Sequence, residues 1–315
     1  MKSRRSEYDV TNKVNITNSD AVCDEVCKLF AEIYPKVSNQ PIKQAYQVIS
    51  RLFQGGYPGY HACDTPYHDL QHTLDVSLAM IRLLYGYENG KKLQMRLGPD
   101  LIILGTIVSL FHDSGYIRRL ADHRQHNGAA YTKKHVTRGG NFLAKFLPEV
   151  GMEEMIPIAR QLIHFTGYEM SISAIPLHEP NHRVLGELLG TADLLAQVSD
   201  RCYLEKCKNR LYFEFVTAGM AGPDVSQALY QSSEELIYKT PQFFKHILYD
   251  RLDGAMHGMH RYIRDFFLPE CDHYRESLEK NCAYLERIVD AKDMSLLRRQ
   301  PPWTLVVQSE SFMLA

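Results

Sequence analysis

Apolar residues recur at the three- and four-residue spacing of an α-helix along almost the whole chain. The alternating apolar and polar pattern of half-buried β-strands, bounded by turn residues, is nearly absent. This periodicity predicts an all-α protein. The expected helices span residues 20–34, 41–53, 67–86, 99–112, 127–147, 152–165, 182–198, 201–218, 223–237, 241–266 and 271–292.

The turn signals along the chain, such as Gly55-Gly56 and Gly98-Pro99, are short, and no stretch is long enough to be an interdomain linker. A length of 315 residues would allow two domains, but the sequence has no internal repeat. We therefore expect a single multi-helix bundle over 41–295. Residues 1–40 form an N-terminal extension and first helix, and 296–315 form a C-terminal tail expected to dock on the body or on a partner.

The charge of the chain is nearly balanced, with 36 Lys and Arg against 37 Asp and Glu. No strong overall field would attract DNA or an anionic membrane, so neither is expected as a partner, and an anionic substrate must be held by local charges. No secretory signal or long apolar segment is seen, and the seven cysteines are scattered without a C-x-x-C pair. We expect a cytoplasmic protein with reduced thiols.

Histidine and aspartate occur in two segments with unusual surroundings. Read as a helix, YHDLQHTLDV (67–76) places His68, His72 and Asp75 on one face, which is either a metal site or a solvated stripe. LIILGTIVSLFHDSGY (101–116) is apolar on every side and ends in His112-Asp113. A buried aspartate is costly unless it is paired or bound to a cation.

Three further polar residues stand in mostly apolar helical segments. His135, His164 and Asp193 follow His112 at successive intervals of 23, 29 and 29 residues, about one helix-turn-helix unit each. Antiparallel helices could therefore bring all of them to one end of a bundle. Mn²⁺, Mg²⁺, Zn²⁺ and Fe²⁺ accept mixed imidazole and carboxylate ligands, and one aspartate can bridge two ions. The pattern predicts a site for divalent metal ions, two in number.

The motif H…HD…D, present as His72, His112-Asp113 and Asp193, resembles the HD-domain metal-dependent phosphohydrolase superfamily. YHDLQHTLDV is also similar to the signature of class I cyclic nucleotide phosphodiesterase catalytic domains. The resemblance covers about residues 40 to 290 and implies an HD/phosphodiesterase-like catalytic domain.

The resemblance also implies roles for individual residues. His68 would be the general acid, and His72, His112, Asp113 and Asp193 would be metal ligands, with Asp113 bridging. His135 and His164 fall at spacings similar to extra histidine ligands of the HD-GYP branch. The implied function is hydrolysis of a small-molecule phosphate ester, a nucleotide or cyclic nucleotide phosphodiester, and a homodimer is compatible with it. Near the ligands, Arg118 and Arg119 are the candidates for binding substrate phosphate, although a solvated face is the commoner explanation for such residues.

The sequence departs from the phosphodiesterase pattern in two places. Tyr116 stands where those enzymes have a further histidine, and residues 123–148 contain no carboxylate to replace their water-binding glutamate. Two alternatives therefore stay open: an HD-type di-iron oxygenase, for which His135 and His164 would suit iron, and a non-catalytic nucleotide-binding sensor module. Phe243 and Phe244 are expected in the core rather than in a binding wall.

Overall fold

The computed structural model of the protein describes residues 4–267 and 271–302, and its regular structure within these ranges is helical. Pairing of extended segments is limited there to two isolated bridges, Tyr8 with Asn15 and Tyr60 with Arg119. The prediction of an all-α fold is confirmed. The α-helices are α1 (Ser19–Ile33), α2 (Gln40–Phe53), α3 (Leu70–Asn89), α4 (Pro99–Phe111), α5 (His135–Phe146), α6 (Ile156–Leu162), α7 (Pro180–Ser199), α8 (Tyr203–Lys206), α9 (Tyr212–Thr217), α10 (Ser233–Lys245), α11 (Arg261–Phe267) and α12 (His273–Ala291).

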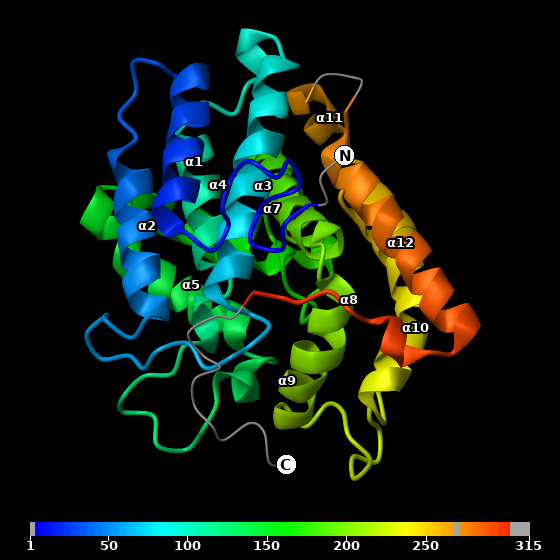
Figure 1. Ribbon diagram of the computed structural model, residues 1–315. Helices are drawn as coiled ribbons and strands as arrows, with labels where there is room; N and C mark the ends of the chain where they lie inside the picture. Colours follow the sequence, from blue (N-terminus) through cyan, green and yellow to red (C-terminus); the bar gives the residue numbers. More distant parts are fainter. Residues whose placement is uncertain (1–3, 268–270, 303–315) are drawn as a thin grey trace.

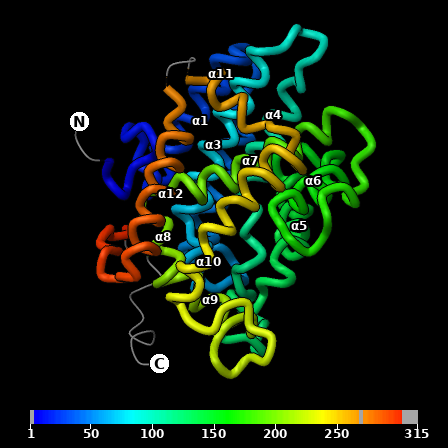
Figure 2. The backbone as a smooth tube through the Cα atoms, turned by 90° about the vertical axis from the view of Figure 1, so that its right-hand side faces the viewer, coloured from blue at the N-terminus to red at the C-terminus, as the bar shows by residue number. Residues whose placement is uncertain are grey.

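Helix α3 forms the centre of the bundle. It packs against α1, α4, α7 and α11, and nearly all of its residues are buried. Figure 1 shows α1 and α2 on one side of α3, with α12 on the other. Figure 2, turned by 90°, shows α10 and α12 on one flank and α5 and α6 on the other. Helix α4 is also buried along most of its length, from Ile102 to Phe111, as its apolar sequence predicts.

Several predicted helix boundaries are wrong: α6 begins at Ile156 and not at 152, and the break expected between 237 and 241 lies inside α10. Three other predicted starts differ near the candidate site. The helix expected from residue 67 begins at Leu70, because the Asp69 side chain caps it by accepting a hydrogen bond from the backbone N–H of His72 at 2.9 Å. His68 therefore lies before the helix and not on a helical face with His72. The helix expected from 127 begins at His135, after a short 3₁₀ turn. The helix expected from 223 begins only at Ser233, with the Ser232 hydroxyl as its cap.

Helices α8 and α9 are joined without a break by a π-helical turn, Cys207–Leu211. A π-turn accommodates one more residue than an α-helical turn, and such turns are frequent at functional sites. The result is one continuous helical segment from Tyr203 to Thr217, which lies below the central helices in the view of Figure 1.

The two ends of the described chain are tied to the bundle by buried polar contacts. Near the N-terminus, Asp9 pairs with Arg82 of α3 at 2.6 Å, and Arg82 also donates to the hydroxyl of Tyr274 in α12 at 3.1 Å. At the other end, Arg210 of the π-turn donates to the carbonyl of Pro302 at 2.6 Å. Of the predicted tail 296–315, residues 303–315 lie outside the described ranges.

Among the helices of the described residues, none combines the length and the apolar character needed to cross a bilayer.

The Asp9–Arg82 pair yields a prediction for stability. The two side chains are 0% and 3% exposed, so Arg82→Met leaves the buried Asp9 carboxylate without its counter-charge. We expect a loss of roughly 3–5 kcal/mol in the free energy of unfolding, measured as a lower midpoint of urea denaturation. The matched control is Arg275→Met, which breaks an exposed pair with Glu279 and should leave the midpoint unchanged. Equal midpoints for both variants would contradict the structural role of Arg82.

Candidate metal centre

Four helices that are far apart in the sequence bring histidine and aspartate side chains together at one place. His72 lies in the first turn of α3, and His135 is the first residue of α5. His112 and Asp113 directly follow the last turn of α4. Asp193 lies within α7. These five residues are called the cluster below.

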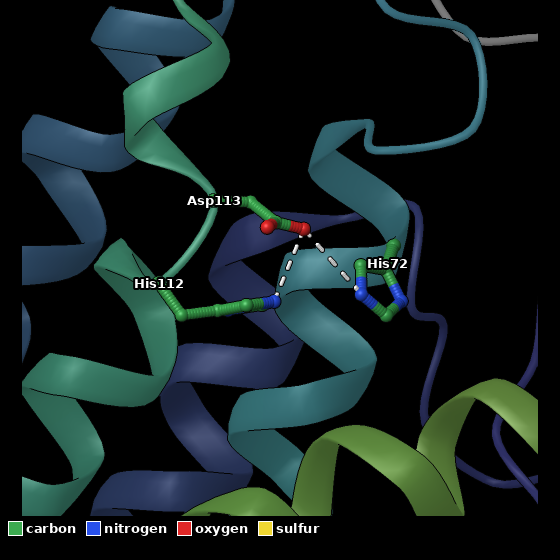
Figure 3. A group of neighbouring side chains, drawn as sticks. All are labelled: His72, His112 and Asp113. Atoms are coloured by element: carbon green, nitrogen blue, oxygen red, sulfur yellow. Dashed lines mark ion pairs between the residues drawn. The ribbon is translucent and has the colours of Figure 1, made fainter. Parts of the chain in front are cut away.

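Asp113 is at the centre of the cluster. Its Oδ2 lies 3.1 Å from His112 Nε2 and 3.5 Å from His72 Nε2, as Figure 3 shows. Its Oδ1 lies 3.7 Å from His135 Nε2. Asp193 closes the arrangement, because its Oδ1 is 3.3 Å from His72 Nε2 and 3.8 Å from His112 Nε2. The sequence-predicted convergence of these residues is therefore present.

Two atoms of the cluster are buried without a hydrogen-bond partner. They are His112 Nε2 and Asp113 Oδ2, which lie close together but are not aligned as donor and acceptor. His112 Nδ1 lies 2.8 Å from the carbonyl of Ser109, which can only accept, so this nitrogen carries a proton and Nε2 is the nitrogen left to bind a second proton or a metal ion. A lone pair and a carboxylate oxygen buried side by side are costly unless a cation binds both.

The donor set fits a divalent metal ion. His72, His112 and Asp113 each offer a ligand atom, and these atoms lie within 4.8 Å of one another. His135 is oriented like His112, since its Nδ1 lies 2.7 Å from the carbonyl of Thr132 and its Nε2 faces the cluster. A backbone carbonyl that fixes the ring in this way is typical of metal-binding histidines.

The charges in the cluster favour a cation. Burial lowers the pKa of His112, but the carboxylates of Asp113 and Asp193 outweigh this effect and raise it to about 9. Burial of Asp113 acts to raise its pKa, yet the imidazoles of His112 and His68 hold it far below its usual range. Asp113 therefore stays ionised, and its charge is balanced either by protonation of the neighbouring imidazoles or by a metal ion.

His68 lies beside the cluster and is held by Glu214 of α9, a residue that the sequence did not point to. The Nδ1 of His68 is 2.5 Å from Glu214 Oε2, and Oε1 of the same carboxylate accepts from the backbone N–H of Tyr67 at 2.6 Å. Burial lowers the pKa of His68, but Glu214 and Asp113 raise it to about 9. His68 is therefore protonated near neutral pH, with Nε2 as the ring nitrogen available to a ligand.

Tyr116 is the residue that replaces the further histidine of the phosphodiesterase pattern. Its ring stacks on His68 with centroids 4.4 Å apart and on His135 with centroids 4.5 Å apart, so it contacts both imidazoles. Gly115 permits this packing, because a Cβ there would lie 1.8 Å from the carbonyl oxygen of His135. Tyr116 thus fixes the position of both rings.

Three predicted site residues are not brought into the cluster. The Nδ1 of His164 lies 2.6 Å from Glu169 Oε1, and no contact of His164 with Asp113 or Asp193 is found among the described residues. Arg118 pairs with Asp64 at 2.7 Å, and neither Arg118 nor Arg119 lines the cavity beside the cluster. The placement of Arg118 and Arg119 does not support a role in binding phosphate.

A cavity of about 660 Å³ extends from the cluster. Lys133 and Glu169 line it, together with His68 and the cluster residues. Glu169 is a carboxylate outside 123–148, which sequence reasoning missed, although it lies only five residues after His164. Phe244 is buried as expected, but the prediction for Phe243 is wrong, because this side chain lines the cavity.

Comparison with known proteins gives a match for part of the sequence and a relative for the fold. A family model described as Npun_R2479-like matches residues 121–263, and no curated protein matches the chain. The crystal structure of the phosphodiesterase domain of Salpingoeca rosetta rhodopsin phosphodiesterase superposes with a TM-score of 0.53 and 13% sequence identity, covering 91% of this chain and 92% of that one. The protein therefore has a fold like that of a phosphodiesterase domain.

The geometry predicts which substitutions affect metal binding. Asp113→Asn should weaken Mn²⁺ binding by about a hundredfold or more, since Asp113 contacts three imidazoles of the cluster, and even residues that only support metal ligands contribute 10- to 100-fold. Isothermal titration calorimetry measures the affinity, and circular dichroism checks the fold. His164→Gln is the control and should bind Mn²⁺ like the unaltered protein. Equal weakening in both variants would place His164 among the ligands.

Proposed function

We propose that this protein is a metal-dependent phosphohydrolase of the HD-domain, phosphodiesterase-like type, which hydrolyses a phosphate ester. The observation that carries the proposal is the buried, unpartnered pair of His112 Nε2 and Asp113 Oδ2 beside His68, which Glu214 holds. The fold likeness to a phosphodiesterase domain supports it. The family resemblance of the sequence implies a nucleotide or cyclic nucleotide phosphodiester as substrate.

His72, His112, Asp113 and Asp193 would hold a divalent ion, Mn²⁺, Mg²⁺, Zn²⁺ or Fe²⁺, and His135 adds an imidazole on the Oδ1 side of Asp113 for a second one. When bound, the metal would withdraw charge from the phosphoryl oxygens and lower the pKa of an attacking water. Lys133, which lines the cavity, supplies a positive charge for the remaining phosphoryl oxygen.

His68 would protonate the leaving oxygen. Glu214 holds Nδ1 and stabilises the imidazolium, so that Nε2 can give its proton to the departing alkoxide and then recover one from solvent. A positioned general acid is worth roughly a hundred- to ten-thousand-fold in rate.

Glu169 would orient the attacking water, the role that no carboxylate in 123–148 can take. Burial acts to raise its pKa, but the hydrogen bond from His164 lowers it below its ordinary value, so Glu169 is ionised and able to accept a hydrogen bond. His164 then acts on Glu169 rather than on a metal.

One observation favours a second candidate, the di-iron oxygenase. His135 Nε2 lies 3.7 Å from Asp113 Oδ1, and additional imidazole ligands suit iron. For a non-catalytic sensor module the described residues offer no comparable support, because a binding site has no need of the His68–Glu214 pair.

The proposal is tested with bis(p-nitrophenyl) phosphate and a panel of nucleotides, using protein loaded with each metal in air and under nitrogen. We expect oxygen-independent hydrolysis, which would remove the oxygenase. His68→Ala should keep its metal and lose at least about a hundredfold in rate on diphenyl phosphate, whose phenolate needs protonation, and less on the p-nitrophenyl ester. Absence of hydrolysis with every substrate would make the binding module the better reading.

The His68–Glu214 pair also predicts a pH dependence. The acid form of His68 is required, so activity falls as the pH rises through its pKa, which Glu214 raises above the ordinary value of a histidine. Glu214→Gln removes the negative charge that raises this pKa, and the alkaline limb of the kcat/KM profile on diphenyl phosphate should move to lower pH. Glu276→Gln, far from the site and exposed, is the control and should leave the profile in place. An unmoved limb in Glu214→Gln would show that His68 is not the acid.

A further inference from the structure

The cavity beside the cluster has two walls of different chemistry. One wall carries His68, Lys133, Glu169 and the cluster. The other comes from residues 203–243 and is apolar: it includes Leu211, Phe215, Met220, Tyr230, Leu236 and Phe243. In the part of the chain that the structure describes, no Lys, Arg, Asp or Glu after Asp193 lines the cavity. We call the part of the cavity that this second wall bounds the apolar chamber.

The chamber is too large to serve a phosphoryl group alone. The whole cavity of about 660 Å³ lies within the range of sites that enclose a drug-sized ligand, roughly 300–1,000 Å³. Because the cluster accounts for the phosphoryl end, the remaining volume is available to the organic part of a substrate.

Several polar groups near the chamber are already in use. The amide nitrogen of Gln197 donates to the hydroxyl of Tyr67 at 2.8 Å. The hydroxyls of Thr240 and Thr166 donate to backbone carbonyls of Leu236 and Ile163, each at 2.8 Å. Most of the remaining lining is apolar. A nucleobase carries several donors and acceptors on its edge, and burying them unpaired is unfavourable. The chamber therefore fits a group without hydrogen-bonding edges better than a base.

The charge at the cavity limits the number of phosphate groups that a substrate can carry. Lys133 is the one Lys or Arg side chain among the described lining residues, so a substrate with several phosphates would lack counter-charges. A phosphodiester, with a single negative charge at the cluster, matches this supply.

Two exposed residues at the rim of the cavity present mainly apolar surface. Tyr168 and Leu229 line the cavity and are nevertheless 61% and 49% exposed. Leu229 lies in the loop between α9 and α10, where its N–H donates to the carbonyl of Met220 at 2.8 Å. Exposed apolar side chains at the rim extend the contact that is available to a long apolar group.

Resting on the proposed function, we infer that the substrate is a phosphodiester with a large apolar ester group, an alkyl chain or an aromatic hydrocarbon, which fills the apolar chamber while the phosphoryl group lies at the cluster. This differs from the nucleotide that the sequence resemblance implies.

The test keeps the reacting centre constant and changes only the apolar group. Methyl, butyl and octyl p-nitrophenyl phosphate share one leaving group, so their kcat/KM values with Mn²⁺-loaded protein report binding of the alkyl chain. We expect at least a tenfold rise from methyl to octyl, because burial of each methylene is favourable. Naphthyl p-nitrophenyl phosphate, compared with the octyl ester, distinguishes an aromatic from an alkyl group.

A pair of variants locates the effect. Leu229→Asp introduces a charge at the apolar rim and should abolish most of the gain in kcat/KM of the octyl ester over the methyl ester. Leu93→Asp makes the same change at a position that is 78% exposed and outside the cavity, and should change neither. A flat series, or higher kcat/KM for cyclic nucleotides that is insensitive to Leu229→Asp, would overturn the inference.

Binding separates this inference from the proposed function. Isothermal titration calorimetry with octylphosphonate and methylphosphonate needs no turnover. Suppose that no ester is hydrolysed, but octylphosphonate binds at least tenfold more tightly than methylphosphonate and Leu229→Asp removes the difference. The inference of an apolar chamber is then supported, and the proposed hydrolase function is contradicted. If both phosphonates bind with the same affinity, the inference of an apolar chamber is contradicted, even where esters are hydrolysed.

Discussion

Ionised Asp113 at the end of a buried helix is the constraint on which the site depends. Helix α4 is apolar all round, so the residues at its C-terminal end enter an interior that holds little water. There a carboxylate is stable only beside positive charge. The imidazoles of His72, His112 and His135 surround it, and their approach draws α3 and α5 to the same place. One helix end therefore sets the position of the others.

The site is built mainly from helix ends. His72 lies in the first turn of α3, His135 begins α5, and His112 follows α4. The Asp69 cap of α3 also pairs with Arg210 at 3.3 Å, so the start of that helix is fixed by the segment carrying Glu214. Polar groups at helix termini are satisfied by caps and not by the helix itself, which makes these ends suitable places for ligands. The helix ends therefore hold these side chains in fixed positions, where polar atoms can bind a ligand.

Periodicity predicted the helical class, and the spacing of His112-Asp113, His135 and Asp193 predicted that they converge. The family resemblance added His72 to this set. Boundaries failed where a cap competed with an apolar pattern, as at Asp69. Glu214 could not be found, because its contact with His68 spans 146 residues and depends on how α9 packs. His164 was predicted as a ligand from spacing alone, and its pairing with Glu169 requires the conformation of the intervening loop.

The π-turn at Cys207–Leu211 has a consequence for how such a site can change during evolution. Successive residues of an α-helix are rotated by about 100° around its axis. A lineage that lost one residue within this turn would keep the whole helical segment, yet Glu214 would face away from His68. A single-codon deletion could thus remove the contact between Glu214 and His68 while the segment stays helical, and a single-codon insertion could restore it.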